Sequence, residues 1–506
     1  MEGKVQEMLF NTVQYLIFLP IVVLIYYILP PKVRYVWLLG ASCYFYMQWN
    51  KVYLLLLLFC TIVTYTGGRL IERFKDEHRQ SGRKGLNNKK LYLIVCIVLN
   101  LGVLFFFKYF SWGVSMLNRV LSAVHAGEIT WGMSIVLPVG ISFYVLQSLG
   151  YLIDVYRGDI YAEKNFIRYA LFVSFFPQLV AGPIERSKNL LVQLHEAHGF
   201  QYENVRKGAI LILYGLFLKV VIADRAAIVV NTVYEDSAGY PGFFILIATV
   251  LFSIQIYCDF YGYSTIARGS ALLMGIRLMD NFDAPYYARS VREFWRRWHI
   301  SLSGWFRDYL YIPLGGSRKG TARKEYNRMV VFAVSGLWHG ASLSFLFWGL
   351  LNGMGQVAED LAENIKKRLG NPHMQKAVCF SKKLCQTLCT FGFVTLAWMF
   401  FRASGLKDAF LILRDMCSCM NWTILFDGSL YELGVARGPM NMLLMAIVAL
   451  FAVDYLKYKG HDVAELFLKQ DWWFRTVIIM AMTFITLLYG CYGTLYDTTQ
   501  FIYFQF

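Results

Sequence analysis

The chain has 506 residues, of which 57% are hydrophobic, 17% aromatic and only 16% charged, with a formal net charge of +16. This balance excludes an ordinary soluble domain. Apolar runs long enough to cross a bilayer core of about 30 Å recur along the whole length. The sequence therefore predicts a polytopic membrane protein built from helices, because a helix satisfies its own backbone polar groups in lipid. The basic residues cluster between apolar runs, which indicates membrane topology and contact with anionic lipid, and not nucleic acid.

The candidate spans follow one another along the chain and are interrupted by several prolines and glycines. They lie at residues 9–29, 35–49, 52–66, 91–110, 131–151, 165–183, 207–230, 242–261, 329–351, 386–402, 439–457 and 473–494. Because some are short, we expect about ten to thirteen transmembrane helices, with re-entrant or interfacial helices among them. No internal repeat or flexible linker is evident, so residues 1–506 are predicted to form one integral membrane domain.

Charge between the spans predicts their orientation. The loop 67–90 carries eight Lys or Arg against three acidic residues, so the positive-inside rule places it in the cytoplasm. Counting back three spans puts the N-terminus outside. Segment 364–383 is also basic and is expected to be cytoplasmic. The first run, 9–29, has no basic leader or small-residue cleavage site, so we expect it to be retained as a span.

Cysteine and histidine spacing gives little support for a metal site. Several of the ten cysteines lie inside apolar runs, where cysteine behaves as a small hydrophobe. Cys417 and Cys419 form C-x-C and not paired C-x-x-C motifs. His195 and His198 form an H-x-x-H pair, but the sequence offers no third ligand nearby. We expect no metal and no disulfide framework.

The stretch 285–328 is aromatic, basic and too polar to cross lipid alone. If 289–300 forms one helix, four side chains fall within an arc of about 80°: Arg289, Arg292, Arg296 and His299. Such a stripe is typical of an amphipathic helix that binds lipid headgroups. It also suits a clamp for the phosphates of a donor such as coenzyme A. The following PLGGSRKG (313–320) is a turn or a phosphate cradle, and it lacks the order of a P-loop.

His339 lies near the centre of the predicted span 329–351, within SGLWHGAS (335–342). A buried histidine bonded to a backbone carbonyl or a nearby hydroxyl is the ordinary explanation. At mid-membrane, however, polar side chains are costly and tend to be functional. Gly336 and Gly340 would allow close approach of a helix or a substrate. Histidine is the natural general base for a hydroxyl near neutral pH, whereas the absence of a G-x-S-x-G elbow gives no support to a serine hydrolase.

Five stretches together resemble the membrane-bound O-acyltransferase (MBOAT) family, in its bacterial branch of polysaccharide acetylation and teichoic-acid D-alanylation. They are LPVGISFYVLQSLGYLIDVYRG (137–158), FPQLVAGPIER (176–186), IYCDFYGYSTIARGSALLMGI (256–276), REFWRRWHISLSGWFRDYLYIPLGGSR (292–318) and SGLWHGASLSFLFWG (335–349). The resemblance covers about 137–350 strongly. It implies an all-α ring of helices around a central catalytic core that opens toward each membrane face.

The resemblance also implies roles for individual residues. His339 matches the family's catalytic histidine, and His299 matches a second histidine of this branch. The donor-binding candidates are cationic: Arg292, Arg296, Arg297 and Arg307. The orienting candidates are Asp259, Asp308 and Trp338. The chain departs from the branch in DFYGYSTIA (259–267), where relatives often read DFSGYSDIA, so we assign no catalytic role to Thr265.

The implied reaction carries an acyl group from cytoplasmic acetyl-CoA, a substrate and not a bound cofactor, to a polysaccharide or wall polymer outside the cell. The implied setting is a bacterial inner membrane, with an extracytoplasmic acyltransferase of the SGNH type as partner. The C-terminal region 386–506 ends in FIYFQF (501–506). This ending resembles the tail of a small D-alanylation partner in which a tyrosine has been proposed to carry the acyl group. Tyr503 is therefore a candidate nucleophile, or else part of an aromatic anchor at the membrane interface.

Three other functions remain open at this point. D-alanyl transfer from a carrier protein is an alternative, because a basic cytoplasmic surface suits an acidic carrier. A transporter or flippase also suits many spans and a mid-membrane polar residue, although no inverted repeat is evident. A noncatalytic scaffold is the third, and the two histidines argue against it.

Overall fold

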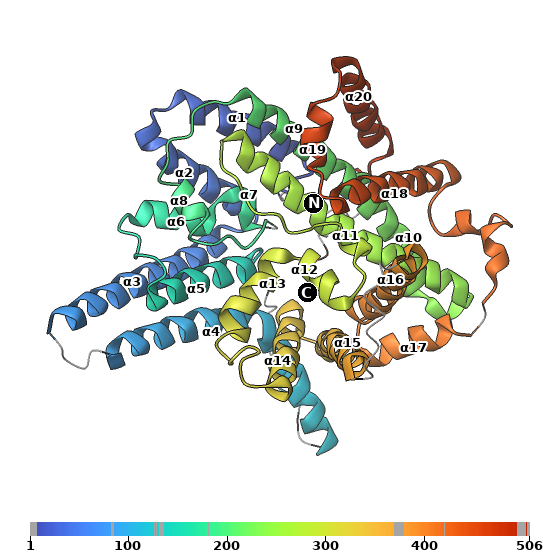
Figure 1. Cartoon of the computed structure of the whole chain (residues 1–506), viewed down its shortest axis with the longest axis horizontal. Coiled ribbons are helices and arrows are strands. Elements are labelled where there is room, and N and C mark those ends of the chain that lie inside the picture. Colours follow the sequence, from blue (N-terminus) through green and yellow to red (C-terminus); the bar gives the residue numbers. More distant parts are fainter. Residues whose placement is uncertain are drawn as a thin grey trace. The chain divides into compact units, whose positions relative to one another are not determined.

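The computed structural model describes residues 8–81, 86–125, 127, 129–130, 136–180, 182–368, 379–418, 420–492 and 502. Within these ranges all regular structure is helical and no strand occurs, which confirms the all-α class. Figure 1 labels the helices. They fall into two compact units, Met1–Ile212 with Ile266–Met279 (unit 1) and Leu213–Thr265 with Asp280–Phe506 (unit 2). The single domain 1–506 stays a prediction.

Unit 1 contains the N-terminal helices. They are α1 (Val13–Ile28), η1 (Pro31–Val33), α2 (Arg34–Met47), α3 (Lys51–Ser81), α4 (Leu86–Ala123), α5 (Ile141–Arg157), α6 (Phe166–Ser174), α7 (Phe176–Leu179), α8 (Leu190–Gln193) and most of α9 (Tyr202–Leu216). The long helices α3, α4 and α5 pack on one another, side by side in Figure 1.

The predicted span 165–183 is not one helix. Asn165 caps α6 by accepting hydrogen bonds from the amides of Ile167 and Arg168, and α6 ends at Ser174. A new short helix, α7, begins at Phe176 with Pro177 in its first turn. Proline has no N–H and its ring would clash with the carbonyl of the residue four positions earlier. The candidate span 165–183 therefore comprises two short helices, interrupted next to Pro177.

Unit 2 contains the remaining helices. They are the π-helical turn η2 (Phe217–Ala223), α10 (Asp224–Glu235), η3 (Ser237–Gly239), α11 (Gly242–Leu273, which continues into unit 1), η4 (Pro285–Tyr287), α12 (Val291–Arg297), α13 (Ile300–Phe306), the π-helical turn η5 (Arg307–Tyr311), α14 (Thr321–His339), α15 (Leu343–Arg368), α16 (Phe380–Arg402), α17 (Leu406–Met416), η7 (Trp422–Leu425), η8 (Ser429–Glu432), α18 (Arg437–Tyr458), α19 (Val463–Leu468) and α20 (Trp472–Tyr489).

Six helices in the described part of the chain are long and apolar enough to cross a membrane. The segments are Lys51–Phe74, Asn88–Ala123, Gly242–Leu273, Phe380–Arg402, Arg437–Tyr458 and Trp472–Tyr489. Val13–Ile28 is a shorter apolar helix. These helices make the chain a multi-pass membrane protein, whereas the expected number of ten to thirteen spans stays a prediction.

An aromatic cluster forms the core of unit 2. The indoles of Trp298, Trp348 and Trp398 are almost completely buried. Trp398 lies between the other two, with ring centroids 5.0 Å from Trp298 and 5.3 Å from Trp348. Such pairs add about 0.5–1.5 kcal/mol each beyond the burial of their apolar area. They join the residue that directly follows α12 to α15 and α16, and both candidate histidines lie next to this core.

Candidate active site

His339 is the last residue of α14, and the chain turns directly after it. Gly340 is extended (φ −164°, ψ 154°), and α15 begins three residues later at Leu343. The predicted span 329–351 is therefore two packed helices and not one, which corrects the sequence-based expectation. The break places His339 at a helix end, where its side chain is buried.

Glycines explain why α14 and α15 can pack so closely. A Cβ atom at Gly336 would lie 2.3 Å from the carbonyl oxygen of Phe345, and one at Gly349 would lie 2.2 Å from that of Phe332. Both distances are far below van der Waals contact, so any side chain at these positions would push the two backbones apart. The pairings run in opposite directions along the two helices. They define an antiparallel hairpin with His339 at its turn.

Aromatic rings surround the imidazole of His339. Its ring centroid lies 4.9 Å from Trp338, 5.1 Å from Trp348 and 5.3 Å from Phe401, all in edge-to-face arrangements. The residue itself is only 4% exposed. An imidazole in such an apolar surrounding is shielded from bulk water, and its polar interactions are stronger there than in water.

His299 lies between two short helices. α12 ends at Arg297 and α13 begins at Ile300, while His299 adopts a left-handed backbone conformation (φ 44°, ψ 55°). The single helix expected over 289–300 was therefore wrong, and the cationic stripe does not continue to His299. A left-handed conformation is uncommon for a residue with a Cβ and persists where surrounding contacts hold it.

Backbone hydrogen bonds from a neighbouring segment hold this junction. Asn281 accepts bonds from the amide of Ile300 through its carbonyl oxygen at 2.9 Å and from that of Ser301 through its side-chain oxygen at 3.3 Å. The amide of Asp283 donates to the carbonyl of Arg297 at 3.0 Å. These bonds fix the chain on both sides of His299.

Trp338 lies next to both histidines. Its ring centroid is 6.3 Å from His299 and 4.9 Å from His339. On another side, the ring of Phe260 packs edge-to-face on His299 at 4.6 Å. Burial lowers the pKa of His299 to about 3, so its imidazole is neutral at physiological pH. The structure thus brings the two histidines and Trp338 into one buried group.

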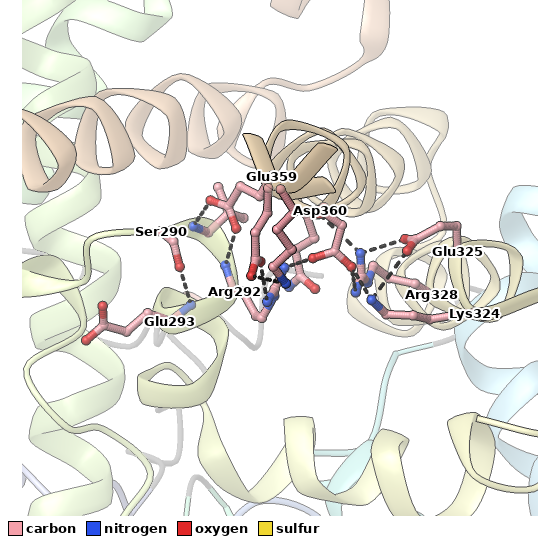
Figure 2. A network of polar contacts seen from close by, with 12 residues as sticks. Ser290, Arg292, Glu293, Lys324, Glu325, Arg328, Glu359 and Asp360 are labelled. Atoms are coloured by element: carbon pink, nitrogen blue, oxygen red, sulfur yellow. Dashed lines mark hydrogen bonds and ion pairs between the residues drawn. The ribbon is translucent and has the colours of Figure 1, made fainter. Parts of the chain in front are cut away.

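Arg292 belongs to an ionic network around Asp360, drawn in Figure 2. Its guanidinium pairs with Asp360 and, at 3.8 Å, with Glu363. Asp360 also receives Lys324 and, at 2.9 Å, Arg328. Glu359 accepts the amides of Val291 and, at 3.2 Å, Arg292, so it caps the start of α12. Carboxylates therefore already engage Arg292.

The other three candidate arginines differ from one another. Arg297 pairs with Asp283 at 2.7 Å and with Glu293 at 3.1 Å. Arg307 is mostly exposed and pairs with its neighbour Asp308 at 2.8 Å. Arg296 is exposed and makes no ion pair with any residue that the structure describes. Arg296 is thus the candidate whose charge is most available to a phosphate.

Two ionisable residues that the sequence analysis overlooked lie beside Asp259. The ammonium of Lys219 is 2.6 Å from Asp259 and 2.8 Å from Asp224. Both had been visible as charges within the predicted apolar span 207–230, a position that itself suggests a role. Tyr503, the third candidate catalytic residue, lies outside the described residues.

Comparison with known proteins identifies the family to which this chain belongs. Residues 160–403 match the membrane-bound O-acyltransferase family. The chain is 37% identical to the probable alginate O-acetylase AlgI of Pseudomonas aeruginosa, over 81% of this chain and 74% of that protein. It is 33% identical to the peptidoglycan O-acetyltransferase of Helicobacter pylori, over 82% of this chain and 80% of that protein. The chain belongs to the membrane-bound O-acyltransferase family.

More distant similarity extends to another acyl transfer. The acyltransferase is 29% identical to the teichoic acid D-alanyltransferase of Streptococcus thermophilus, over 47% of this chain and 60% of that protein. The family match includes His299, His339 and Asp259, whereas Tyr503 lies beyond it. The two buried histidines of this O-acyltransferase therefore lie within the residues that match the family, whereas the C-terminal tail lies outside them.

Proposed function

We propose that this acyltransferase moves an acetyl group from cytoplasmic acetyl-CoA to hydroxyls of an extracytoplasmic polysaccharide or wall polymer. The observation that carries the proposal is a buried imidazole, His339, at the turn of a helical hairpin, with His299 also next to Trp338. The names of the relatives, an alginate O-acetylase and a peptidoglycan O-acetyltransferase, support acetyl as the group and a glycan as the acceptor.

His339 acts as the general base in this proposal. Its imidazole takes the proton of the attacking hydroxyl while the hydroxyl oxygen bonds to the thioester carbonyl carbon. The C–S bond then breaks, and the proton passes from the imidazole to the leaving thiolate, so that free CoA and an acetyl ester are formed. Neutral His299 is a candidate to hydrogen-bond the carbonyl oxygen as negative charge develops on it.

The attacking hydroxyl in the first transfer is proposed to be the phenol of Tyr503. An acetyl-tyrosine at the chain end divides one transfer across the membrane into two local steps. A second acyltransferase, of the extracytoplasmic SGNH type, would then pass the acetyl group to the polymer. Replacing Tyr503 by Phe keeps the aromatic ring and removes the nucleophile. Full polymer acetylation by Tyr503→Phe would show that this route is wrong.

Donor binding is proposed to depend on exposed cations near α12. Arg296 is the strongest candidate, because no described carboxylate pairs with it. Arg307 is exposed but pairs with Asp308, while Arg292 and Arg297 are more fully engaged. The proposed setting is the inner membrane, with the N-terminus and the acceptor on the outer side.

The test uses the purified full chain in liposomes with isotopically labelled acetyl-CoA, followed by peptide mass spectrometry. Wild type is compared with His339→Ala and with His461→Ala, a matched control at an exposed histidine. Removing a general base should lower transfer about a hundredfold or more, and the control should match wild type. Equal transfer by His339→Ala and wild type would overturn the assignment of the base.

The donor is tested in the same preparation. Label on Tyr503 that disappears in His339→Ala supports both the acetyl donor and the tyrosine route. Label only on an added acceptor supports acetyl transfer and removes Tyr503 from the mechanism. If acetyl-CoA gives no transfer while a D-alanyl carrier protein does, the acetyl proposal is wrong and the similarity to the D-alanyltransferase is the better guide.

A further inference from the structure

A buried ionic cluster in unit 2 holds one ammonium and two carboxylates. Lys219 of η2 contacts Asp259 of α11 at 2.6 Å and Asp224 of α10 at 2.8 Å. The side chains of Lys219 and Asp259 are 1% and 3% exposed, and that of Asp224 is 13% exposed. We call these three residues the buried cluster. Because the carboxylates outnumber the ammonium, oxygen atoms remain that Lys219 does not use.

One of these remaining oxygens holds the C-terminal end of the chain. The backbone amide of Ile502 donates to the second carboxylate oxygen of Asp259 at 2.8 Å, across 243 residues of sequence. Ile502 is itself only 4% exposed. A hydrogen bond from an amide to a buried carboxylate is charge-assisted and stronger than a neutral one. It fixes the residue that directly precedes Tyr503.

Two further contacts hold the preceding chain to the same place. The amide of Cys491 donates to the carbonyl of Val220, within η2, at 3.0 Å. The guanidinium of Arg225, one residue beyond Asp224, donates to the carbonyl of Tyr489 at 2.5 Å. A π-helical turn displaces backbone carbonyls from their usual partners and is often found at functional sites. Here the carbonyl of Val220, in the π-helical turn η2, accepts a hydrogen bond from the amide of Cys491.

The anchor is next to the histidine group along α11. Asp259 binds Ile502, and the following residue, Phe260, packs its ring on His299 at 4.6 Å. His299 in turn lies beside Trp338, whose neighbour is His339. A continuous series of contacts therefore leads from Ile502 to the proposed base, all within unit 2.

We propose that the buried cluster is the device that positions the acyl-accepting tail, with Asp259 as the positioning residue and Lys219 orienting its carboxylate. The inference rests on the proposed Tyr503 route, since it assigns the means by which that residue is delivered to the histidines. It assigns no chemical step to Asp259. The hydrogen bond restricts the positions that the tail can adopt. It therefore contributes to the rate of acyl transfer and not to the binding of the donor.

The chain offers a selective test of this hydrogen bond. Ile502→Pro removes the amide donor and leaves all three residues of the buried cluster in place. Ile502→Val is the matched control, because it keeps the amide and nearly all of the buried side chain. Asp259→Ala removes the acceptor, while Lys219 keeps Asp224 as a partner of opposite charge. All three are made in the full chain, in nanodiscs, and checked for monodispersity.

The first measurement is carboxypeptidase trimming of the chain end, followed by intact mass, which needs no catalysis. The second is the initial rate of label incorporation into Tyr503 from acetyl-CoA. Loss of one hydrogen bond to a charged group should raise trimming and lower acetylation about tenfold or more in Ile502→Pro and Asp259→Ala. Ile502→Val should change both readouts much less than Ile502→Pro, and the KM for acetyl-CoA should not change in any variant.

The outcomes separate this inference from the function on which it rests. If Ile502→Pro is trimmed and acetylated like Ile502→Val, the anchor has no positioning role and the inference is overturned. If trimming changes as expected but wild-type Tyr503 carries no acetyl group, the anchor is supported and the tyrosine route is wrong. A raised KM for acetyl-CoA in Asp259→Ala would also overturn the inference, because it would place Asp259 in donor binding.

Discussion

The buried cluster and the Asp360 network (Arg292, Lys324, Glu325, Arg328, Glu359 and Asp360) are two ionic groups of unit 2, each with one central charge that has several partners of opposite sign. In the first, one ammonium serves two carboxylates, and in the second the carboxylate of Asp360 receives three cations. Each group also has a carboxylate that accepts a backbone amide. Asp259 binds Ile502, and Glu359 binds the start of α12.

The two groups differ most in their access to water. Lys219 is 1% exposed, whereas Arg292 and Lys324 are 33% and 30% exposed. Water and salt can compensate a missing partner in the Asp360 network, but not in the buried cluster. The Asp360 network therefore holds a local helix end at modest cost. The buried cluster binds Ile502, which is distant in sequence, through charges whose loss of a partner would strongly destabilise the fold.

The largest effect is expected when the buried cluster loses its cation. Lys219→Met leaves two carboxylates buried without an ammonium, which should reduce the free energy of unfolding by about 3–5 kcal/mol. Asp360→Asn should cost only about 1–2 kcal/mol, and less at high salt, because two of its three cations, Arg292 and Lys324, reach water. Thermal unfolding of both variants in detergent, at low and high salt, checks the difference.

A double variant sharpens the same comparison. Adding Asp259→Asn to Lys219→Met removes one of the two negative charges and should recover part of the lost stability. Equal stability of Lys219→Met and wild type would mean that the buried cluster is not held by charge. In that case the contrast with the Asp360 network would be wrong.

Burial of His299 should also make the stability of the protein depend on pH. Its folded-state pKa, about 3, lies below the usual value of 6.5, so the unfolded chain binds this proton first as the pH falls. The stabilisation due to a neutral His299 is therefore complete above pH 6.5 and is lost as the pH decreases from 6.5 toward 3. At pH 5 the loss should be about 2 kcal/mol.

The check compares the pH dependence of the melting temperature for wild type and His299→Gln. Wild type should lose more stability than the variant between pH 7.5 and pH 5, because glutamine binds no proton. Parallel curves for the two proteins would mean that His299 titrates near its usual value. His461→Ala, at an exposed histidine, is the control for removing a histidine elsewhere in the chain.

The sequence pointed to both histidines and to Asp259, and the structure shows where local patterns were enough and where they were not. An imidazole within an apolar run identified His339, because ionisable groups are costly there. The same run gave no sign that the helix ends at His339. The close packing of Gly336 and Gly349 against the opposite backbone, which defines the hairpin, appears only in the structure.

Other features could not follow from local patterns. The helix 289–300 looked continuous because its residues are compatible with a helix, whereas Asn281 and Asp283 bind the chain on both sides of a left-handed His299. No local sequence pattern indicates that the amide of Ile502 binds the carboxylate of Asp259, 243 residues away. By contrast, Lys219 and Asp224 could have been found by the rule that identified His339, since both lie in a predicted span.

The smallest expected effect concerns the exposed cations beside the Asp360 network. Arg296 has no carboxylate partner among the described residues, so it can bind a phosphate without breaking an existing ion pair. Arg296→Ala should raise the KM for acetyl-CoA about five- to tenfold with kcat nearly unchanged, because it removes binding that is equal in ground and transition states.

Arg292→Ala should instead lower stability with little change in KM, since Asp360 and Glu363 already engage that guanidinium. Steady-state kinetics of both variants, with Arg296→Lys as a charge-preserving control, decide between them. A larger rise in KM for Arg292→Ala than for Arg296→Ala would show that the donor displaces the carboxylates of the Asp360 network, and the network would then be part of the donor site.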